Sequence, residues 1–283
     1  MVRVPQCRRL GALRWFLERC LGSCSRSRFG VPPHELHDYV ELNARLLPSR
    51  TKGRGGITSD FILIPGAGGI ATPYWRIVNA QLENAGHHAL PVDLPGSDPK
   101  AGLPEYAALI IDAIESCAEP VVVAQSMGGF SAVMACDRIP VGGLILVNAM
   151  VPAPGETPGE WWAATGAINA RIAAAEAGAY DTDFDLETYF LHDLSPEEAA
   201  AVLANPGDEV DIAFGQRCDV ERWPDVATAA VIGRDDRLFP IEFQRRLLRE
   251  RVGVDAIVVP GGHLLALANP NALFQALLQV TDA

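Results

Sequence analysis

Apolar runs of strand length alternate with longer amphipathic stretches along most of the chain. The runs are rich in Val, Ile and Leu and occur at residues 61–65, 87–93, 120–125, 142–149, 229–233 and 256–260. Helical spacing of apolar positions predicts helices at residues 72–85, 103–117, 127–137, 240–251 and 270–279. Nearly continuous apolar runs joined by crossover helices are typical of parallel strands that are buried on both faces. The pattern therefore predicts an α/β fold with a mostly parallel, doubly wound sheet.

The alternation is interrupted by residues 151–225, which carry helical patterns but no clear strand and are called the insertion below. Ser195 and Pro196 are typical of the cap and the first residue of a helix. We expect the insertion to form a helical lid over the carboxyl edge of the sheet. Trp161 and Trp162 either pack in the core or border a substrate pocket there.

The first apolar run leads into a glycine-rich turn. Residues 66–71 satisfy the G-x-G-x-x-G/A spacing of dinucleotide-binding folds, and Asp93 follows where a ribose-binding acid belongs. In those folds the helix begins inside the glycine pattern, so that its first amides meet the pyrophosphate. Here we expect Thr72 to cap the helix and Pro73 to begin it, beyond the pattern, with Asp93 in a loop. The turn is therefore predicted to serve another chemistry, and no organic cofactor is expected.

A serine follows the third run, in the sequence AQSMGG. Ser126 has Ala124 two positions before it and Gly128 two positions after it, which fits a nucleophile elbow with alanine in place of the first glycine. Small neighbours let the strand and the helix approach closely, and the strained turn lifts the hydroxyl clear of the sheet. Ser126 is a candidate nucleophile that needs a base and an orienting acid.

Both partners follow later strands. Asp236 comes three residues after Gly233, next to a second acid, Asp235, and His263 follows the last apolar run. The order Ser126, acid, His263 is that of a known catalytic triad whose members each lie beyond the carboxyl end of a strand. Asp236 is preferred as the acid and Asp235 is the alternative, since only one of the two can face the histidine.

The motifs PGAGG, AQSMGGF, GRDDRLFP and GGHLLALANP resemble the α/β-hydrolase superfamily over nearly all of residues 58–283. AGHHALPVDLPGSD and HDLSPEEAAA look like its esterase and hydroxynitrile-lyase branch, which includes plant methylesterases. The resemblance implies an α/β-hydrolase fold with a helical lid. It also implies Ser126 as nucleophile, His263 as general base and acid, and Asp236 as the group that orients His263.

The resemblance further implies an oxyanion hole formed by the backbone amides of Ala67 and Met127. Pro65 departs from the histidine that many relatives carry at its position, but a backbone contact from Ala67 stays usable. No metal ion is expected in this chemistry.

The function implied is that of a serine hydrolase that cleaves a small or medium carboxylic ester through an acyl-enzyme on Ser126. One alternative is a carbon–carbon lyase of the hydroxynitrile type with the same triad. Such lyases tend to place a lysine near the active site, whereas the only lysines here are Lys52 and Lys100. The other alternative is a non-catalytic small-molecule receptor built on a hydrolase fold.

The charge of the chain is divided unevenly. Residues 1–54 carry 11 Lys and Arg against 4 Asp and Glu, which leaves 12 against 31 for the remainder of the 283 residues. An acidic body repels phosphate backbones, so we expect no nucleic-acid partner. No apolar run approaches the roughly 18 to 20 residues of a membrane span, so stable membrane insertion is not expected.

Residues 1–55 are predicted to be a basic extension and residues 56–283 the catalytic domain. The extension fits a tail, an upstream translation start or a targeting segment. The six cysteines lack paired ligand spacing and are expected to be free thiols in a reducing compartment, the cytoplasm. His87 and His88 have no acidic or cysteine partner at ligand spacing, so a structural role is predicted for both. His192, beside Asp193, either lines the pocket or is structural.

Overall fold

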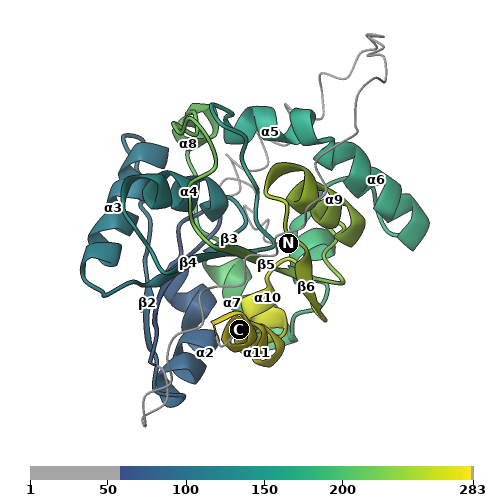
Figure 1. Cartoon of the computed structure of the whole chain (residues 1–283). Coiled ribbons are helices and arrows are strands. Elements are labelled where there is room, and N and C mark those ends of the chain that lie inside the picture. Colours follow the sequence, from purple (N-terminus) through teal and green to yellow (C-terminus); the bar gives the residue numbers. More distant parts are fainter. Residues whose placement is uncertain (1–57, 282–283) are drawn as a thin grey trace.

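The computed structural model describes residues 58–281, so the predicted extension and Lys52 lie outside the described residues. A parallel sheet forms the centre of the molecule (Figure 1). Its six strands lie in the order β2-β1-β3-β4-β5-β6. Every predicted run overlaps one strand, and the predicted parallel sheet is confirmed. The strands are β1 (Asp60–Ile64), β2 (His88–Pro91), β3 (Val121–Gln125), β4 (Gly143–Val147), β5 (Thr228–Gly233) and β6 (Ala256–Val259).

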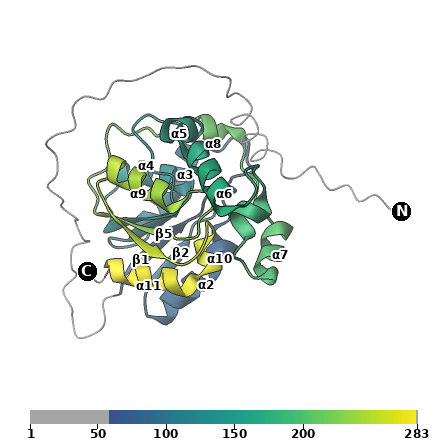
Figure 2. The ribbon, with the colours of Figure 1, turned by 90° about the vertical axis from the view of Figure 1, so that its right-hand side faces the viewer.

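Helices cover both faces of the sheet, because alternate residues of the strands enter two separate cores. In β1, Ile62 and Ile64 face one core and Phe61 and Leu63 face the other, and all four side chains are fully buried. One face packs against α3 (Leu103–Glu115), α4 (Gly128–Arg138) and α9 (Ile241–Arg251) (Figures 1 and 2). The other packs against α2 (Ala71–Asn84), α10 (Leu265–Ala268) and α11 (Pro270–Thr281). Of these six helices, only the short α10 was not predicted.

The insertion between β4 and β5 contains helices and no strand. The helices are α5 (Pro158–Thr165), α6 (Ala167–Gly178), the π-helix η1 (Glu187–Leu191), α7 (Pro196–Ala204) and α8 (Asp211–Gly215). Ser195 caps α7 as predicted, since its hydroxyl accepts from the amide of Glu198 at 3.2 Å.

The start of α2 differs from the prediction. The helix begins at Ala71, within the glycine pattern, and Thr72 lies inside it. The N-cap residue, Ile70, offers no side-chain hydrogen bond, and Asp93 supplies it instead: its Oδ1 accepts from the amides of Ala71 at 2.7 Å and Thr72 at 3.0 Å, and its Oδ2 accepts from the Thr72 hydroxyl at 2.7 Å. The predicted cap was wrong because the carboxylate comes from the loop after β2. That carboxylate lies on the amides that a pyrophosphate would need.

The described helices include none that combines the length and the apolar character needed to cross a membrane. Cys117, Cys136 and Cys218 are free thiols. Burial raises the pKa of Cys136 and of Cys218 to about 12, so both thiols stay protonated and unreactive at neutral pH. Cys7, Cys20 and Cys24 lie outside the described residues.

Candidate active site

Ser126 occupies a strained turn between β3 and α4. Its φ is +49°, in the left-handed region that residues other than glycine rarely adopt. The strain is accommodated by small neighbours, as predicted from the spacing. A Cβ on Gly128 would lie 2.3 Å from the carbonyl oxygen of Pro65, and one on Gly129 would lie 2.3 Å from that of Met150. Only glycine fits these two positions, which let α4 start directly against the neighbouring loops.

His263 lies next to Ser126. Its Nε2 is 3.0 Å from the Ser126 hydroxyl oxygen, and the imidazole is fully buried. The ring contacts two phenyl rings, those of Phe190 in η1 and Phe239, each with its centroid 5.0 Å away in an edge-to-face arrangement. Neither phenylalanine was recognised in the sequence: Phe190 comes from a segment without a motif, and in the motif GRDDRLFP only the acids before Phe239 were considered. Together they limit the rotation of the imidazole.

Asp236, rather than Asp235, faces the histidine. Its Oδ2 is 2.9 Å from Nδ1 of His263, and its Oδ1 accepts from the amides of Leu238 and Phe239 at 2.9 Å each. A carboxylate can only accept, so Nδ1 carries a hydrogen and Nε2 is left to accept from Ser126.

Asp235 points away from the imidazole. Its carboxylate pairs with Arg234 at 3.2 Å and accepts from the amide of Gly261 at 3.1 Å. The hydrogen bonds from Arg234 lower the pKa of Asp235, so this acid stays ionised at neutral pH. The structure therefore brings together Ser126, His263 and Asp236, the three residues preferred from the sequence.

Two buried amides that sequence reasoning missed hold the loops of the acid and the base. Asn148, just after β4, is fully buried with a φ of +44°. Its Nδ2 donates to the carbonyl oxygens of Gly262 at 2.9 Å and His263 at 3.1 Å, while its Oδ1 accepts from the amide of Gly233 at 2.7 Å. The side-chain amide of Gln244, in α9, donates to Asp236 Oδ2 at 3.2 Å. Only the position of Asn148 after a strand end could have signalled this role.

The glycine turn after β1 lies directly against the elbow. A Cβ on Gly66 would fall 2.9 Å from Cβ of Ser126 and 2.4 Å from Oε1 of Gln125. Ala67 follows in this turn, and Met127 follows Ser126 at the start of α4. Within residues 58–281, neither backbone amide donates to an acceptor. Their part in an oxyanion hole stays a prediction, and this placement is compatible with it.

Trp161 and Trp162 lie in the core. Trp161 is fully buried, its indole nitrogen donates to the carbonyl of Val151 at 2.9 Å, and its ring packs on Phe239 with centroids 5.1 Å apart. Trp162 also packs on Phe239, at 5.5 Å, and Phe239 in turn contacts His263. Contact with a substrate stays a prediction for both tryptophans, and their packing favours the core alternative.

The insertion also reaches the loop that carries His263. Nε2 of His192 donates to the carbonyl oxygen of Asp235 at 3.1 Å, and the carboxylate of Asp193 accepts from the amide of Gly262. Burial lowers the pKa of His192, so its ring is neutral at pH 7. This pair braces the loops of the base and the acid, which is a structural role.

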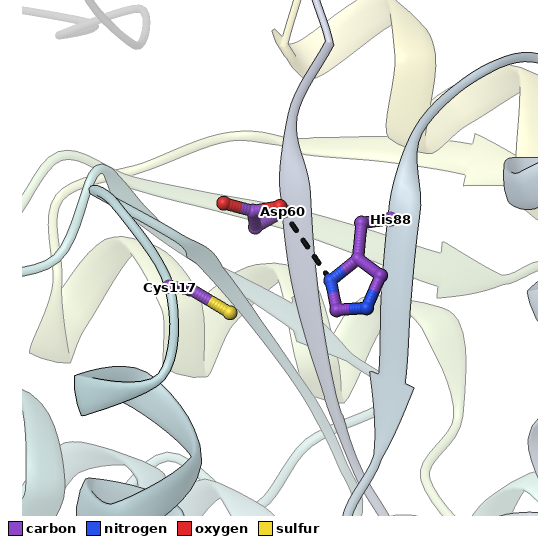
Figure 3. Close-up of side chains that lie close together, drawn as sticks. All are labelled: Asp60, His88 and Cys117. Carbon is purple, nitrogen blue, oxygen red and sulfur yellow. Dashed lines mark ion pairs between the residues drawn. The ribbon is translucent and has the colours of Figure 1, made fainter.

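A second group of potential ligands, Asp60, His88 and Cys117, lies at the amino-terminal ends of β1 and β2 (Figure 3). Asp60 and His88 begin β1 and β2, Cys117 follows α3, and their ligand atoms lie within 4.8 Å of one another. The sequence shows no acidic or cysteine partner of His88 at ligand spacing, because the fold brings these neighbours together from distant positions. The His88 side chain is 62% exposed, and no described residue orients its ring through the second nitrogen, as metal-binding histidines require. We assign no metal to this group.

His87, the residue before His88, has a structural role, as predicted. Nδ1 of His87 accepts from the amide of Ser59 at 3.2 Å, and its ring lies edge-on to Phe61 with centroids 5.5 Å apart. Lys100 is exposed in the loop before α3, where its backbone amide donates to Asp98.

The family model described as the alpha/beta hydrolase family matches residues 61–276. The chain belongs to the alpha/beta hydrolase family. Two plant proteins similar to it are methylesterase 7 of Arabidopsis thaliana and polyneuridine aldehyde esterase of Rauvolfia serpentina, each 24% identical. The alignments cover 74% of this chain and 91% of the first, and 79% of this chain and 96% of the second.

A solved structure has the same fold. The crystal structure of polyneuridine aldehyde esterase superposes with a TM-score of 0.66 at 17% identity, covering 80% of this chain and 100% of that one. At this identity the likeness establishes the architecture alone.

Proposed function

We propose that this alpha/beta hydrolase is a serine esterase that cleaves small or medium carboxylic esters through an acyl-enzyme on Ser126. One observation carries the proposal: a continuous hydrogen-bond chain runs from Ser126 through His263 to Asp236, with contacts of 3.0 and 2.9 Å. The names of the relatives, methylesterase and polyneuridine aldehyde esterase, support an ester as the substrate class.

The first half of the reaction forms the acyl-enzyme. The Ser126 oxygen attacks the ester carbonyl as its proton passes to Nε2 of His263, and Asp236 stabilises the imidazolium that results. The negative charge on the former carbonyl oxygen is held by the amides of Ala67 and Met127. The tetrahedral intermediate then breaks its bond to the alcohol oxygen, which leaves with the proton from His263.

The second half regenerates the enzyme. A water molecule gives a proton to His263 and attacks the acyl carbon, through a second intermediate in the same oxyanion hole. The bond to the Ser126 oxygen breaks, the serine recovers its proton from His263, and the carboxylic acid is released. These steps use only residues of this chain and water.

A panel of p-nitrophenyl and methyl esters with acyl groups of increasing length tests the proposal. The wild type should release acid and alcohol in equal amounts, and Ser126→Ala should lower kcat/KM by on the order of 10⁴-fold or more. Ser131→Ala is the matched control, because Ser131 is a buried serine of α4 whose hydroxyl donates only to the carbonyl of Gly128. Turnover of cyanohydrins but not of esters, or unchanged turnover in Ser126→Ala, would overturn it.

A further inference from the structure

A buried glutamate of the insertion touches the glycine turn. Glu209 lies between α7 and α8, and its Oε2 accepts from the backbone amide of Gly68 at 2.9 Å. The residue is only 4% exposed. Gly68 directly follows Ala67, and none of the proposed catalytic steps uses Glu209.

The second oxygen of Glu209 is held by the core. Oε1 accepts from the hydroxyl of Tyr106 in α3 at 2.6 Å, and Tyr106 is almost fully buried. Burial raises the pKa of Glu209 to about 7, against the opposing effect of the hydrogen bonds from Tyr106 and Gly68. Asp98 and Glu105 are the other acids close to this hydroxyl, and burial together with Glu209 and these acids raises the pKa of Tyr106. Glu209 thus links a fixed helix of the core to the turn.

The backbone around Glu209 lies in direct contact with the turn. A Cβ on Gly68 would fall 3.2 Å from the Cα of Gly207. Gly96, in the loop after β2, lies beside the turn: a Cβ on it would fall 3.0 Å from the carbonyl carbon of Gly68 and 2.7 Å from the carbonyl oxygen of Asp208. The amide of Val210 donates to the carbonyl of Gly96 at 2.9 Å. Residues 206–210 therefore cover the turn without a gap at these points.

The turn needs such external support. Gly68 has a φ of +91° and Gly69 a φ of +70°, which residues with a side chain rarely adopt. Because neither glycine has a Cβ, nothing within the two residues restricts the rotation of their backbone. Within the turn, the hydrogen bond from the amide of Gly69 to the carbonyl of Gly66 is long, at 3.3 Å. The direction of the Ala67 amide therefore depends on contacts from outside the turn.

We propose that Glu209 is a positioning residue for the oxyanion hole, which holds the amide of Gly68 and thereby directs the amide of Ala67 at the reacting carbonyl. This inference rests on the proposed esterase function. Its effect belongs to the transition state, because an amide aimed at a developing oxyanion strengthens tetrahedral species more than the bound ester.

The test compares Glu209→Ala and Glu209→Gln with the wild type on the best ester of the panel. A trifluoromethyl ketone, which forms a tetrahedral adduct with the serine, reports on the oxyanion hole separately. In Glu209→Ala we expect kcat to fall by about 10- to 100-fold, KM to stay within about threefold, and Ki for the ketone to rise in step with the loss of kcat. Glu209→Gln should retain kcat within about threefold, since its amide oxygen can accept from Gly68 while its NH₂ donates to Tyr106.

Asp208→Ala is the matched control, because it removes an exposed carboxylate next to Glu209 and keeps the backbone carbonyl that lies against Gly96. If Glu209→Ala does not fold, Glu209→Asp replaces it: the carboxylate is kept but withdrawn from Gly68, and the same loss of kcat is expected. A Glu209→Ala enzyme that matches Asp208→Ala, or that loses kcat without losing affinity for the ketone, would overturn the positioning role. Failure of the esterase function would appear differently, as a wild type that does not turn over esters.

Discussion

Replacing Asp236 by asparagine tests the hydrogen-bond chain at the position where two adjacent acids compete. The carboxylate of Asp236 accepts at both oxygens: Oδ1 from the amides of Leu238 and Phe239, and Oδ2 from His263 and Gln244. An asparagine has one accepting oxygen, and we expect it to face the backbone amides of Leu238 and Phe239, which lie 2.9 Å from Oδ1. Its NH₂ group then faces Nδ1 of His263.

The consequence follows from the hydrogens on the imidazole. To meet an NH₂ group, Nδ1 must become an acceptor, so the hydrogen moves to Nε2, which faces Ser126 at 3.0 Å. A protonated Nε2 cannot take the serine proton. We expect kcat to fall by on the order of 10⁴-fold, as in the serine-protease example of this substitution, which corresponds to about 5 kcal/mol in the activation free energy.

The assay is the initial rate of p-nitrophenol release at saturating ester, with circular dichroism and Tm as checks on folding. Asp235→Asn is the matched control, since its oxygen can still accept from Gly261 and only the exposed pair with Arg234 is lost. We expect its kcat within about fivefold of the wild type, because exposed ion pairs contribute little. An Asp236→Asn enzyme within about tenfold of the wild type, or an equal loss in Asp235→Asn, would refute the assigned roles.

Three further predictions address the surroundings of the triad. Gly66→Ala should lower kcat by about tenfold or more, because its Cβ would meet Ser126 and Gln125, whereas Gly215→Ala, with open space around it, should not; equal rates in the two variants would contradict this. The contribution of Glu209 to the unfolding free energy should fall by about 3 kcal/mol as pH rises from about 4.5 to about 7, because the folded state raises the pKa of Glu209 and binds its proton more tightly than the unfolded chain. Urea denaturation of Glu209→Gln should lack this part of the decline, and identical pH slopes would argue against it. Asn148→Ala should reduce the unfolding free energy by about 2 kcal/mol or more and lower kcat, since the buried carbonyl of Gly262 and amide of Gly233 lose their partner and the carbonyl of His263 keeps only the long contact from Gln125, at 3.4 Å; a variant as stable as the wild type would exclude this role.

The sheet and the order of the triad were predictable because they depend on local patterns. Each strand is a short run of Val, Ile and Leu, and helix and strand ends agree with the predicted ends within two residues. The elbow was predictable for the same reason: Gly128 follows Ser126 at the spacing that a close strand–helix turn requires.

Contacts between distant segments account for what the sequence did not show. The cap of α2 was misplaced because Asp93, 22 positions from Ala71, supplies it. Glu209 lies 141 positions from Gly68 in a segment with no motif, so its burial and its hydrogen bond to Gly68 are visible only in the fold. The choice between Asp235 and Asp236 likewise needs the direction of each side chain, which adjacent identical residues do not encode.

The central claim is that Ser126 carries an acyl group during turnover. Its most direct test is to quench the wild type during hydrolysis of a slowly deacylating ester and to map the added mass by peptide mass spectrometry. We predict that the peptide containing Ser126 gains the mass of the acyl group, that the adduct decays at the rate of turnover, and that it is absent from Ser126→Ala. Steady ester hydrolysis with no adduct on Ser126, or with the adduct on another residue, would contradict the account.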